Sequence, residues 1–385
     1  MQTPTSHLAT ALSNAALDTK IDPDIIEQLQ HFEDHSALYY SAQRHGLRSL
    51  IYRAIDGFDL TPFIPDKYNK KFKRTYYRTL SKNLRGLKAL EGLRQNLSPQ
   101  IPLLVLKGPA LIHSIYHNPA LRPMTDIDLL VADPEHLSAL NTCMYTLGYA
   151  SPTQYPDIYC KDGVVFDIHT DPFHSDRILQ RRLAVPINLA DLWQDAIPFP
   201  DLSNLYMLNL SDQILTLSVH ALKHGYERKI WLIDILHCVK LACQNGSWHH
   251  VEKRSEQYNT TRILALTLHA IQNLLNAKLP YPAHNLQKSF PIGAIRRKIL
   301  CTSPQPGRFQ ILEPLVMSEQ FPKRIDRLKY LIAFAFPTPK AMQQISGLSG
   351  RFRWLSYPYR IIQLIGLGTL QVFKLIYRLM GTRSQ

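Results

Sequence analysis

Cysteine is scarce in this chain, which has only five in 385 residues. None of them forms a C-x-x-C pair; they are Cys143, Cys160, Cys238, Cys243 and Cys301. Five cysteines are too few for a disulfide scaffold, and their spacing lacks the paired ligands of a structural zinc site. The first twenty residues also lack a basic segment followed by an apolar one, so we expect no secretory signal and a cytoplasmic protein.

Long apolar runs are also missing. No stretch reaches the roughly 18 uninterrupted apolar residues that a membrane-spanning helix needs. The most apolar stretch, residues 361–380, is interrupted by Gln363, Gln371, Lys374 and Arg378. Because these four fall along one helical stripe, the stretch is predicted to be an amphipathic helix. Two interpretations stay open: it packs on the protein's own body, or it makes peripheral contact with the inner membrane surface.

Acidic residues are few, since 30 Asp and Glu stand against 44 Lys and Arg, for a net charge of +14. The positive charge is concentrated in residues 66–97, which are predicted to form one long helix with ten basic residues and only two acids, Asp66 and Glu91. Such a helix attracts phosphate-rich partners, namely RNA, another anionic polymer or an anionic lipid surface. The alternative interpretation is a solvated helix face. Disorder is excluded by a hydrophobic content of 45% and a charged content of 19%.

The order of predicted elements gives an α+β fold, with a small mixed sheet embedded in a mainly helical chain. Short apolar runs with turn residues at their ends predict strands at 101–106, 126–131, 155–160 and 164–169, the last two forming a hairpin. No strand is expected after about residue 200. We therefore divide the chain into an N-terminal helical region (1–97), an α/β core (98–200), a helical domain (201–300) and a C-terminal helical region (301–385).

Carboxylates gather in the predicted α/β core. Asp126 and Asp128 are two residues apart at the start of a strand, so both side chains are expected on one face of the sheet. Asp167 is a third acid in an otherwise apolar strand, where an unpaired carboxylate is costly. Oxygen ligands of this kind suit Mg²⁺, which leaves coordination positions free for phosphate oxygens.

Cations are expected at the same edge of the sheet. Lys107 and Gly108 end one predicted strand and begin a helix, whose backbone N–H groups favour phosphate. Arg122 lies in a loop that is predicted to overhang this edge. Carboxylates, a bound metal, a helix start and two cations together predict a site for a nucleoside triphosphate.

A family resemblance rests on these same residues. The segment LKGPAL at 106–111, Tyr116, and the segment LRPMTDIDLLV at 121–131 resemble the signature of an uncharacterised family of bacterial nucleotidyltransferases with a DNA polymerase beta-like core. The chain is more distantly similar to nucleotidyltransferase toxins of abortive-infection systems. Later residues also match the first family's pattern: Asp167-Ile168-His169, then Asp212, His220, His224 and Asp234.

The resemblance implies specific roles. Asp126, Asp128 and Asp167 would be catalytic and hold two Mg²⁺ ions, while Gly108 would line the phosphates of the NTP. Further residues are candidates for contacting the substrate or supporting the metal ligands: Tyr116, Thr125, His169, His220 and His224. One departure from the wider superfamily is clear, because no serine follows Gly108, which stands eighteen residues before Asp126. The missing phosphate contact then falls to Lys107 or Arg122.

The functional hypothesis is Mg²⁺-dependent transfer of a nucleoside monophosphate from an NTP to an acceptor hydroxyl, with release of pyrophosphate. The sequence identifies neither the base nor the acceptor. Two alternatives stay open. One is a catalytically idle nucleotide-binding scaffold, and the other is a toxin-like enzyme that acts on tRNA ends.

Overall fold

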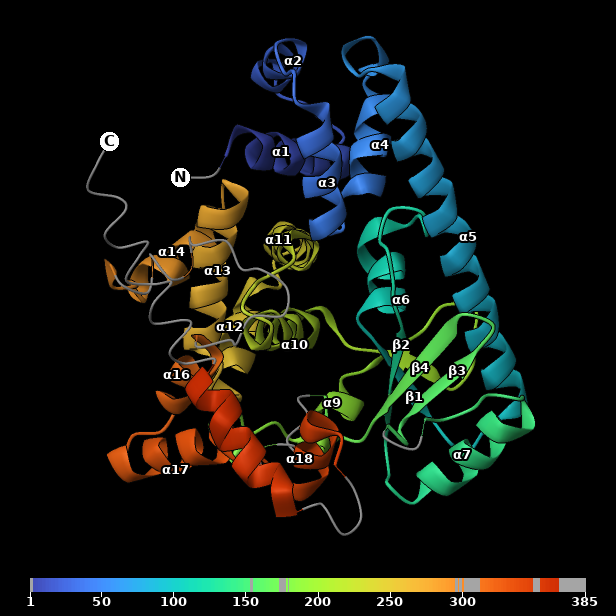
Figure 1. The fold of residues 1–385 in the computed structure, drawn as a ribbon, viewed down its shortest axis with the longest axis vertical. Coiled ribbons are helices and arrows are strands. Elements are labelled where there is room, and N and C mark those ends of the chain that lie inside the picture. The colour runs from blue at the N-terminus through green and yellow to red at the C-terminus, as the bar shows by residue number, and fades with distance from the viewer. Residues whose placement is uncertain are drawn as a thin grey trace.

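A six-stranded sheet lies at one side of the protein and helices form the rest (Figure 1). The computed structural model describes residues 3–152, 155–172, 180–294, 312–348 and 354–366, together with residues 178, 297 and 300. The α+β class that the sequence predicts, a small mixed sheet in a mainly helical chain, is confirmed. Of the amphipathic helix predicted at 361–380, the part from residue 367 onward lies outside the described residues.

The chain begins with four packed helices, α1 (Pro4–Asp18), α2 (Pro23–Gln30), α3 (His35–His45) and α4 (Arg48–Gly57), followed by the short 3-10 helix η1 (Thr61–Phe63). Asp22 caps α2, because its carboxylate accepts a hydrogen bond from the backbone N–H of Asp24 at 3.1 Å. These helices share one core with the later helices α10 to α13.

Helix α5 (Asp66–Asn96) has 31 residues and connects the N-terminal helices to the sheet (Figure 1). It confirms the single long basic helix that the sequence predicts. One of its ten basic residues has a structural role. Arg94 is buried. Its guanidinium donates hydrogen bonds to the carbonyl groups of Leu97, Ser98 and Ile101, in the segment that follows the helix.

The sheet order is β3-β4-β2-β1-β6-β5. Its strands are β1 (Leu103–Leu106), β2 (Ile127–Val131), β3 (Ile158–Lys161), β4 (Val164–His169), β5 (Ile197–Pro198) and β6 (Leu205–Met207). Strand β2 is antiparallel to β1 and parallel to β4, so the sheet is mixed. The expectation of no strand after about residue 200 is wrong, since β6 pairs in parallel with β1. Three residues are too short to show an alternating pattern, and β6 becomes a strand through its partner.

The two faces of the sheet pack into different cores. Leu104, Leu106 and Leu130 belong to a large core shared with α10 (Leu210–Lys223) and α11 (Lys229–Gln244). The alternate residues Val105 and Leu129 pack in a smaller core with α7 (His136–Thr146) and the end of α5. A polar side chain on the first face therefore lies between the sheet and the helical body.

Most other helices continue that body. They are α6 (Gly108–Leu111) with the π-helical turn η2 (Ile112–Tyr116), α8 (Arg181–Ala184), α9 (Leu189–Gln194), α12 (Trp248–Gln257), α13 (Thr261–Leu275), α14 (Tyr281–Ser289), α16 (Leu312–Ser318), α17 (Arg324–Ala335) and α18 (Pro339–Ser346). A helix over residues 356–366 follows. Within the part of the chain that the structure describes, no helix has both the length and the apolar content needed to cross a membrane. The division into four regions stays a prediction.

Candidate active site

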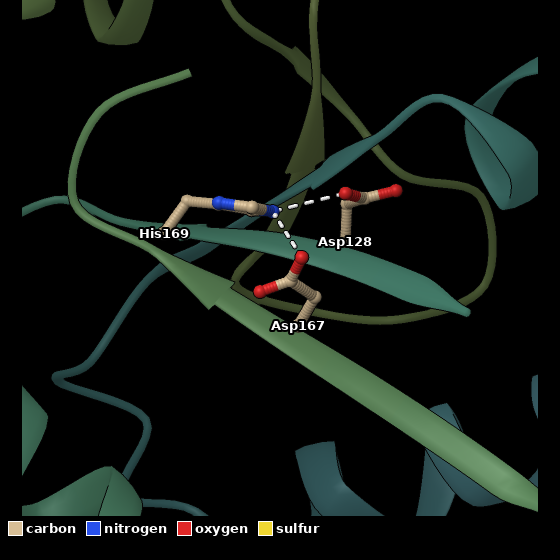
Figure 2. Close-up of side chains that lie close together, drawn as sticks. All are labelled: Asp128, Asp167 and His169. Carbon is tan, nitrogen blue, oxygen red and sulfur yellow. Dashed lines mark hydrogen bonds and ion pairs between the residues drawn. The ribbon is translucent and has the colours of Figure 1, made fainter. Parts of the chain in front are cut away.

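Asp128 and Asp167 lie side by side on neighbouring parallel strands, on the sheet face toward the helical body. They are register partners of β2 and β4, and His169 follows two residues along β4 on the same face. Figure 2 shows one imidazole nitrogen facing both carboxylates: Nε2 of His169 is 2.9 Å from Oδ1 of Asp128 and 3.5 Å from Oδ2 of Asp167. One ligand atom from each of the three residues lies within 4.8 Å of the others.

The two carboxylates have opposite electrostatic surroundings. Burial by itself would raise the pKa of the Asp128 carboxyl, but the Lys107 ammonium and the His169 hydrogen bond outweigh it and hold the pKa well below its usual range. Burial raises the pKa of Asp167, and the charges of Asp128 and Asp126 add to that effect against the opposing influence of His169 and Lys107. The negative charge of Asp167 is thus balanced less completely by neighbouring positive groups than the charge of Asp128.

Lys107 is held at the end of β1 in a strained backbone conformation. Its φ is +51° and its ψ is −113°, a combination that residues with a side chain rarely adopt. This turn brings Nζ to 2.6 Å from Oδ1 of Asp128, while the side chain stays 22% exposed. Lys107 is therefore a partly accessible cation directly at the carboxylate pair, as the sequence predicts.

Gly108 allows the turn after β1 to lie close to the 117–126 loop. A Cβ at this position would be 2.7 Å from the sulfur of Met124 and 2.8 Å from its Cγ, and Met124 is itself buried. Any side chain at this position would force the Met124 side chain to move. The helix that Gly108 starts has only four α-helical residues before η2, so the extended helix start that we expected for phosphate is short.

Asp126 does not share the strand with Asp128. It precedes β2 by one residue, is half-buried, and accepts a hydrogen bond from the hydroxyl of Thr125 at 2.8 Å. Asp126 is absent from the cluster of Asp128, Asp167 and His169, so the structure brings together only two of the three predicted carboxylates at ligand distance. The sequence predicted that His169 supports the metal ligands or contacts the substrate. In the structure its ring nitrogen is itself one of the three candidate metal ligands.

Arg122 does not overhang the sheet edge as expected. Its guanidinium is buried and forms a two-pronged ion pair with Asp234 of α11, with Nη2 at 2.7 Å from Oδ2 and Nε at 3.2 Å from both oxygens. The hydroxyl of Tyr116 donates to the other oxygen, Oδ1, at 2.5 Å. The buried network of Tyr116, Arg122 and Asp234 thus ties the 117–126 loop to the helical body, a role that residue spacing alone did not show.

His220 and His224 lie at the end of α10 and pack against each other and against Trp231, with ring centroids 4.7 to 5.2 Å apart. Burial, followed by the charge of Lys107, lowers the pKa of His220 well below its usual value, while Asp128 opposes the shift. Burial and neighbouring Lys223 lower the pKa of His224 to about 4. Both rings are therefore neutral near pH 7, and neither belongs to a metal-ligand group among the described residues.

Asp212, another match to the family pattern, lies at the opposite end of α10. It forms an ion pair with Arg254 of α12 at 3.1 Å, and burial raises the pKa of Asp212 to about 6. Asp212 therefore supports the packing of α10 on α12 and is separate from the carboxylate pair.

The sequence analysis did not single out Arg228 as a site residue. Its guanidinium lies over the Trp231 ring, at 5.8 Å from the ring centroid. Burial lowers the pKa of Arg228, and Asp234 and Asp126 act against this.

Residues 32–276 match the model of a protein family described as uncharacterised nucleotidyltransferases. The chain belongs to this family. The matched span contains the cluster on β2 and β4, Lys107, and all of α10 and α11. This confirms the family resemblance drawn from the LKGPAL and DID segments. Bacterial origin and the similarity to abortive-infection toxins stay predictions. No curated protein and no solved structure matches the chain.

Proposed function

We propose that this protein transfers a nucleoside monophosphate from an NTP to an acceptor hydroxyl and releases pyrophosphate. The observation that carries the proposal is the pair Asp128 and Asp167, placed side by side on one sheet face with the Lys107 ammonium beside them. Family membership supports nucleotidyl transfer in general. The NTP, the metal and the acceptor are our additions.

The residues of the site fit a divalent cation. The Asp167 carboxylate lies near the Asp128 carboxylate, and burial raises its pKa, an energetic cost that a bound cation removes. Asp128 and Asp167 would hold the ion, with His169 as a third ligand or as the group that orients Asp128. Asp126, whose charge also raises the pKa of Asp167, is the carboxylate available to a second ion. A bound Mg²⁺ would neutralise charge on the triphosphate and lower the pKa of the acceptor hydroxyl.

The chain's own side chains then bind and position the substrate. Lys107 is partly exposed and reaches the carboxylate pair from the end of β1, so it is placed to contact the triphosphate. His220, His224 and Trp231 form a neutral ring cluster near Lys107. Because both imidazoles are neutral near pH 7, Lys107 rather than this ring cluster supplies positive charge beside the carboxylate pair.

Replacing Lys107 with methionine is expected to raise the KM for NTP and to lower kcat, each by about tenfold or more, because a charge contact to the triphosphate is lost. Methionine adopts the strained φ no less readily than lysine, so the backbone cost is matched. Calorimetric titration of NTP with Mg²⁺ measures the affinity. Lys88→Met, at an exposed position of α5, is the control. Equal affinity and kcat in Lys107→Met and the parent would remove Lys107 from the nucleotide site.

For the acceptor we propose an anionic polymer, with RNA as the first candidate. The support is the path of α5, whose basic face reaches the sheet edge beside Asp126. Lys82 Nζ is 3.5 Å from the carbonyl oxygen of Thr125, and Arg85 Nη1 is 3.4 Å from that of Asp162. A polymer bound along α5 would present its end close to the carboxylates.

Exchanging Lys70, Lys71, Arg74 and Arg78 for glutamine is expected to weaken RNA binding and to reduce the slope of log K against log salt by up to about 3, since each phosphate contact contributes roughly 0.7. NTP affinity should stay unchanged. Filter binding at several salt concentrations measures the effect, and the same exchange at exposed Lys253, Arg262, Lys278 and Lys288 is the control. No RNA binding by the parent at low salt would leave the α5 face as a solvated surface and favour a small or protein acceptor.

Incubation with each labelled NTP, Mg²⁺ and total cellular RNA separates the remaining alternatives. Label joined to an acceptor supports transfer, and label at tRNA ends supports the toxin-like activity. Bound NTP with no turnover on any acceptor pool in a lysate supports an idle nucleotide-binding scaffold.

A further inference from the structure

The last described helix, residues 356–366, has its apolar side outward. Ile362 and Ile365 are 71% and 61% exposed, and Trp354, just before the helix, is 67% exposed. The buried positions are instead polar, namely Ser356 and Arg360. A surface helix of a soluble domain normally shows the opposite arrangement, with its apolar stripe toward the core.

A second apolar stripe lies on α17. Ile325, Leu328 and Ile332 are spaced by three and four residues, which places them on one helix face, and Phe336 follows directly after the helix; each is 39% to 56% exposed. The two stripes are close together. Arg360 Nε donates to the carbonyl oxygen of Ala335, at the end of α17, at 3.1 Å, and the helix over 356–366 is seen beside α17 in Figure 1.

These stripes concentrate the exposed apolar surface of the protein. Of the nineteen large hydrophobic residues exposed among the described part of the chain, ten fall between residues 325 and 365. We call the exposed apolar side chains of α17 and of residues 354–365 the C-terminal apolar surface. A patch this concentrated marks a binding surface, because single exposed hydrophobic residues are ordinarily scattered.

The charge around this surface identifies its partner. The one acid of α17, Asp326, pairs with Lys329 at 3.3 Å, and Arg360 is buried. Lys323, Arg324 and Lys329 are exposed on or next to α17. Exposed isoleucine, tryptophan and tyrosine with basic residues at the margin are the composition of helices that lie in a membrane interface, and the basic residues favour anionic lipids.

We propose that the C-terminal apolar surface docks on an anionic membrane, with its isoleucine and tryptophan side chains inserted at the boundary between headgroups and acyl chains. The proposal does not depend on the nucleotidyl transfer. It requires only that the apolar face of these two helices enters lipid and that their basic residues approach the headgroups.

Vesicle flotation with the full chain tests the proposal. We expect the protein to float with vesicles of phosphatidylcholine mixed with phosphatidylglycerol, to float less with phosphatidylcholine alone, and to lose binding as salt is raised. The double variant Ile362→Glu, Ile365→Glu should reduce the bound fraction about tenfold or more, because two charges must then enter the interface. The matched control is Leu183→Glu, Tyr281→Glu, at two exposed apolar positions elsewhere that are 70% and 77% exposed.

A second measurement needs no charged substitution. Brominated lipid should quench part of the protein's tryptophan fluorescence, and Trp354→Phe should remove most of the quenched fraction. Three outcomes would overturn the proposal. They are no flotation on anionic vesicles at low salt, equal flotation of the Ile362→Glu, Ile365→Glu variant, and a concentration-dependent dimer that the same variant abolishes. The last outcome would assign the surface to a second copy of the chain. Lipid binding through α5 is tested with the variant in which Lys70, Lys71, Arg74 and Arg78 are glutamine. This variant should still float, because its C-terminal apolar surface is unchanged.

Discussion

Replacing Asp128 with asparagine is expected to lower kcat for nucleotidyl transfer by at least about 1000-fold, a loss of roughly 4 kcal/mol of transition-state stabilisation. Asp128 is 4% exposed and contacts both Lys107 and His169 through its Oδ1 atom. Asparagine keeps the shape of the side chain but removes the charge that a metal ion needs. Pyrophosphate release under saturating NTP and Mg²⁺ measures the effect.

The matched control is Asp162→Asn in the turn between β3 and β4. Asp162 is exposed and has a φ of +49°, a conformation that asparagine tolerates well, so activity and stability should both be unchanged. Titration with Mn²⁺ should show weaker metal binding in Asp128→Asn and no change in Asp162→Asn. Retention of more than about a tenth of the parent's kcat by Asp128→Asn would contradict a metal role for this carboxylate.

The sequence was sufficient for the elements whose signal is local. The apolar runs around Leu104 and Leu129 predicted β1 and β2, and the hairpin was predicted from the Lys161-Asp162-Gly163 turn. Strand β6 could not be predicted, because its three residues become a strand only through hydrogen bonding to β1. Local pattern therefore located the four neighbouring strands β3, β4, β2 and β1 and missed β6 and β5, where tertiary pairing decides.

The sequence indicated the candidate site as a set of residues, whose roles stay predictions, but it did not indicate their geometry. Alternation along a strand placed Asp126 and Asp128 together, yet β2 begins after Asp126, so the periodicity does not extend to it. The partner of Asp128 is Asp167, which lies 39 positions further along the sequence, and only the parallel register of β2 and β4 brings them together. The two-residue spacing of Asp167 and His169 could not reveal that the His169 ring contacts both carboxylates.

Arg122 shows the limit most clearly. A basic residue shortly before a pair of acids suggested a phosphate contact, and nothing in its neighbourhood indicated Asp234, 112 residues later. Long-range ion pairs leave no local signal, since each partner only has to be compatible with its own helix or loop. In the structure, the Arg122 guanidinium is buried and pairs with Asp234 instead of lying at the surface.

Replacing Arg122 with methionine is therefore expected to lower the free energy of unfolding by about 3 to 5 kcal/mol, because it leaves the Asp234 carboxylate buried without its cation. Asp234 is 0% exposed and would keep only the Tyr116 hydroxyl as a partner within this network. Chemical denaturation, followed by circular dichroism, measures the loss. The control is Lys70→Met, which removes an ion pair to Asp66 whose side chains are both about three-quarters exposed and should cost under about 1 kcal/mol.

The double variant Arg122→Met, Asp234→Leu separates a structural role from a nucleotide-binding role. With both charges removed, no buried charge is left uncompensated, so the double variant should be more stable than Arg122→Met alone. If the role of Arg122 is structural, the folded double variant is expected to bind NTP with the same affinity as the parent. If Arg122→Met unfolds like the parent but its KM for NTP rises about tenfold, the guanidinium would contact phosphate after all, and the ion pair with Asp234 would have to open when nucleotide binds.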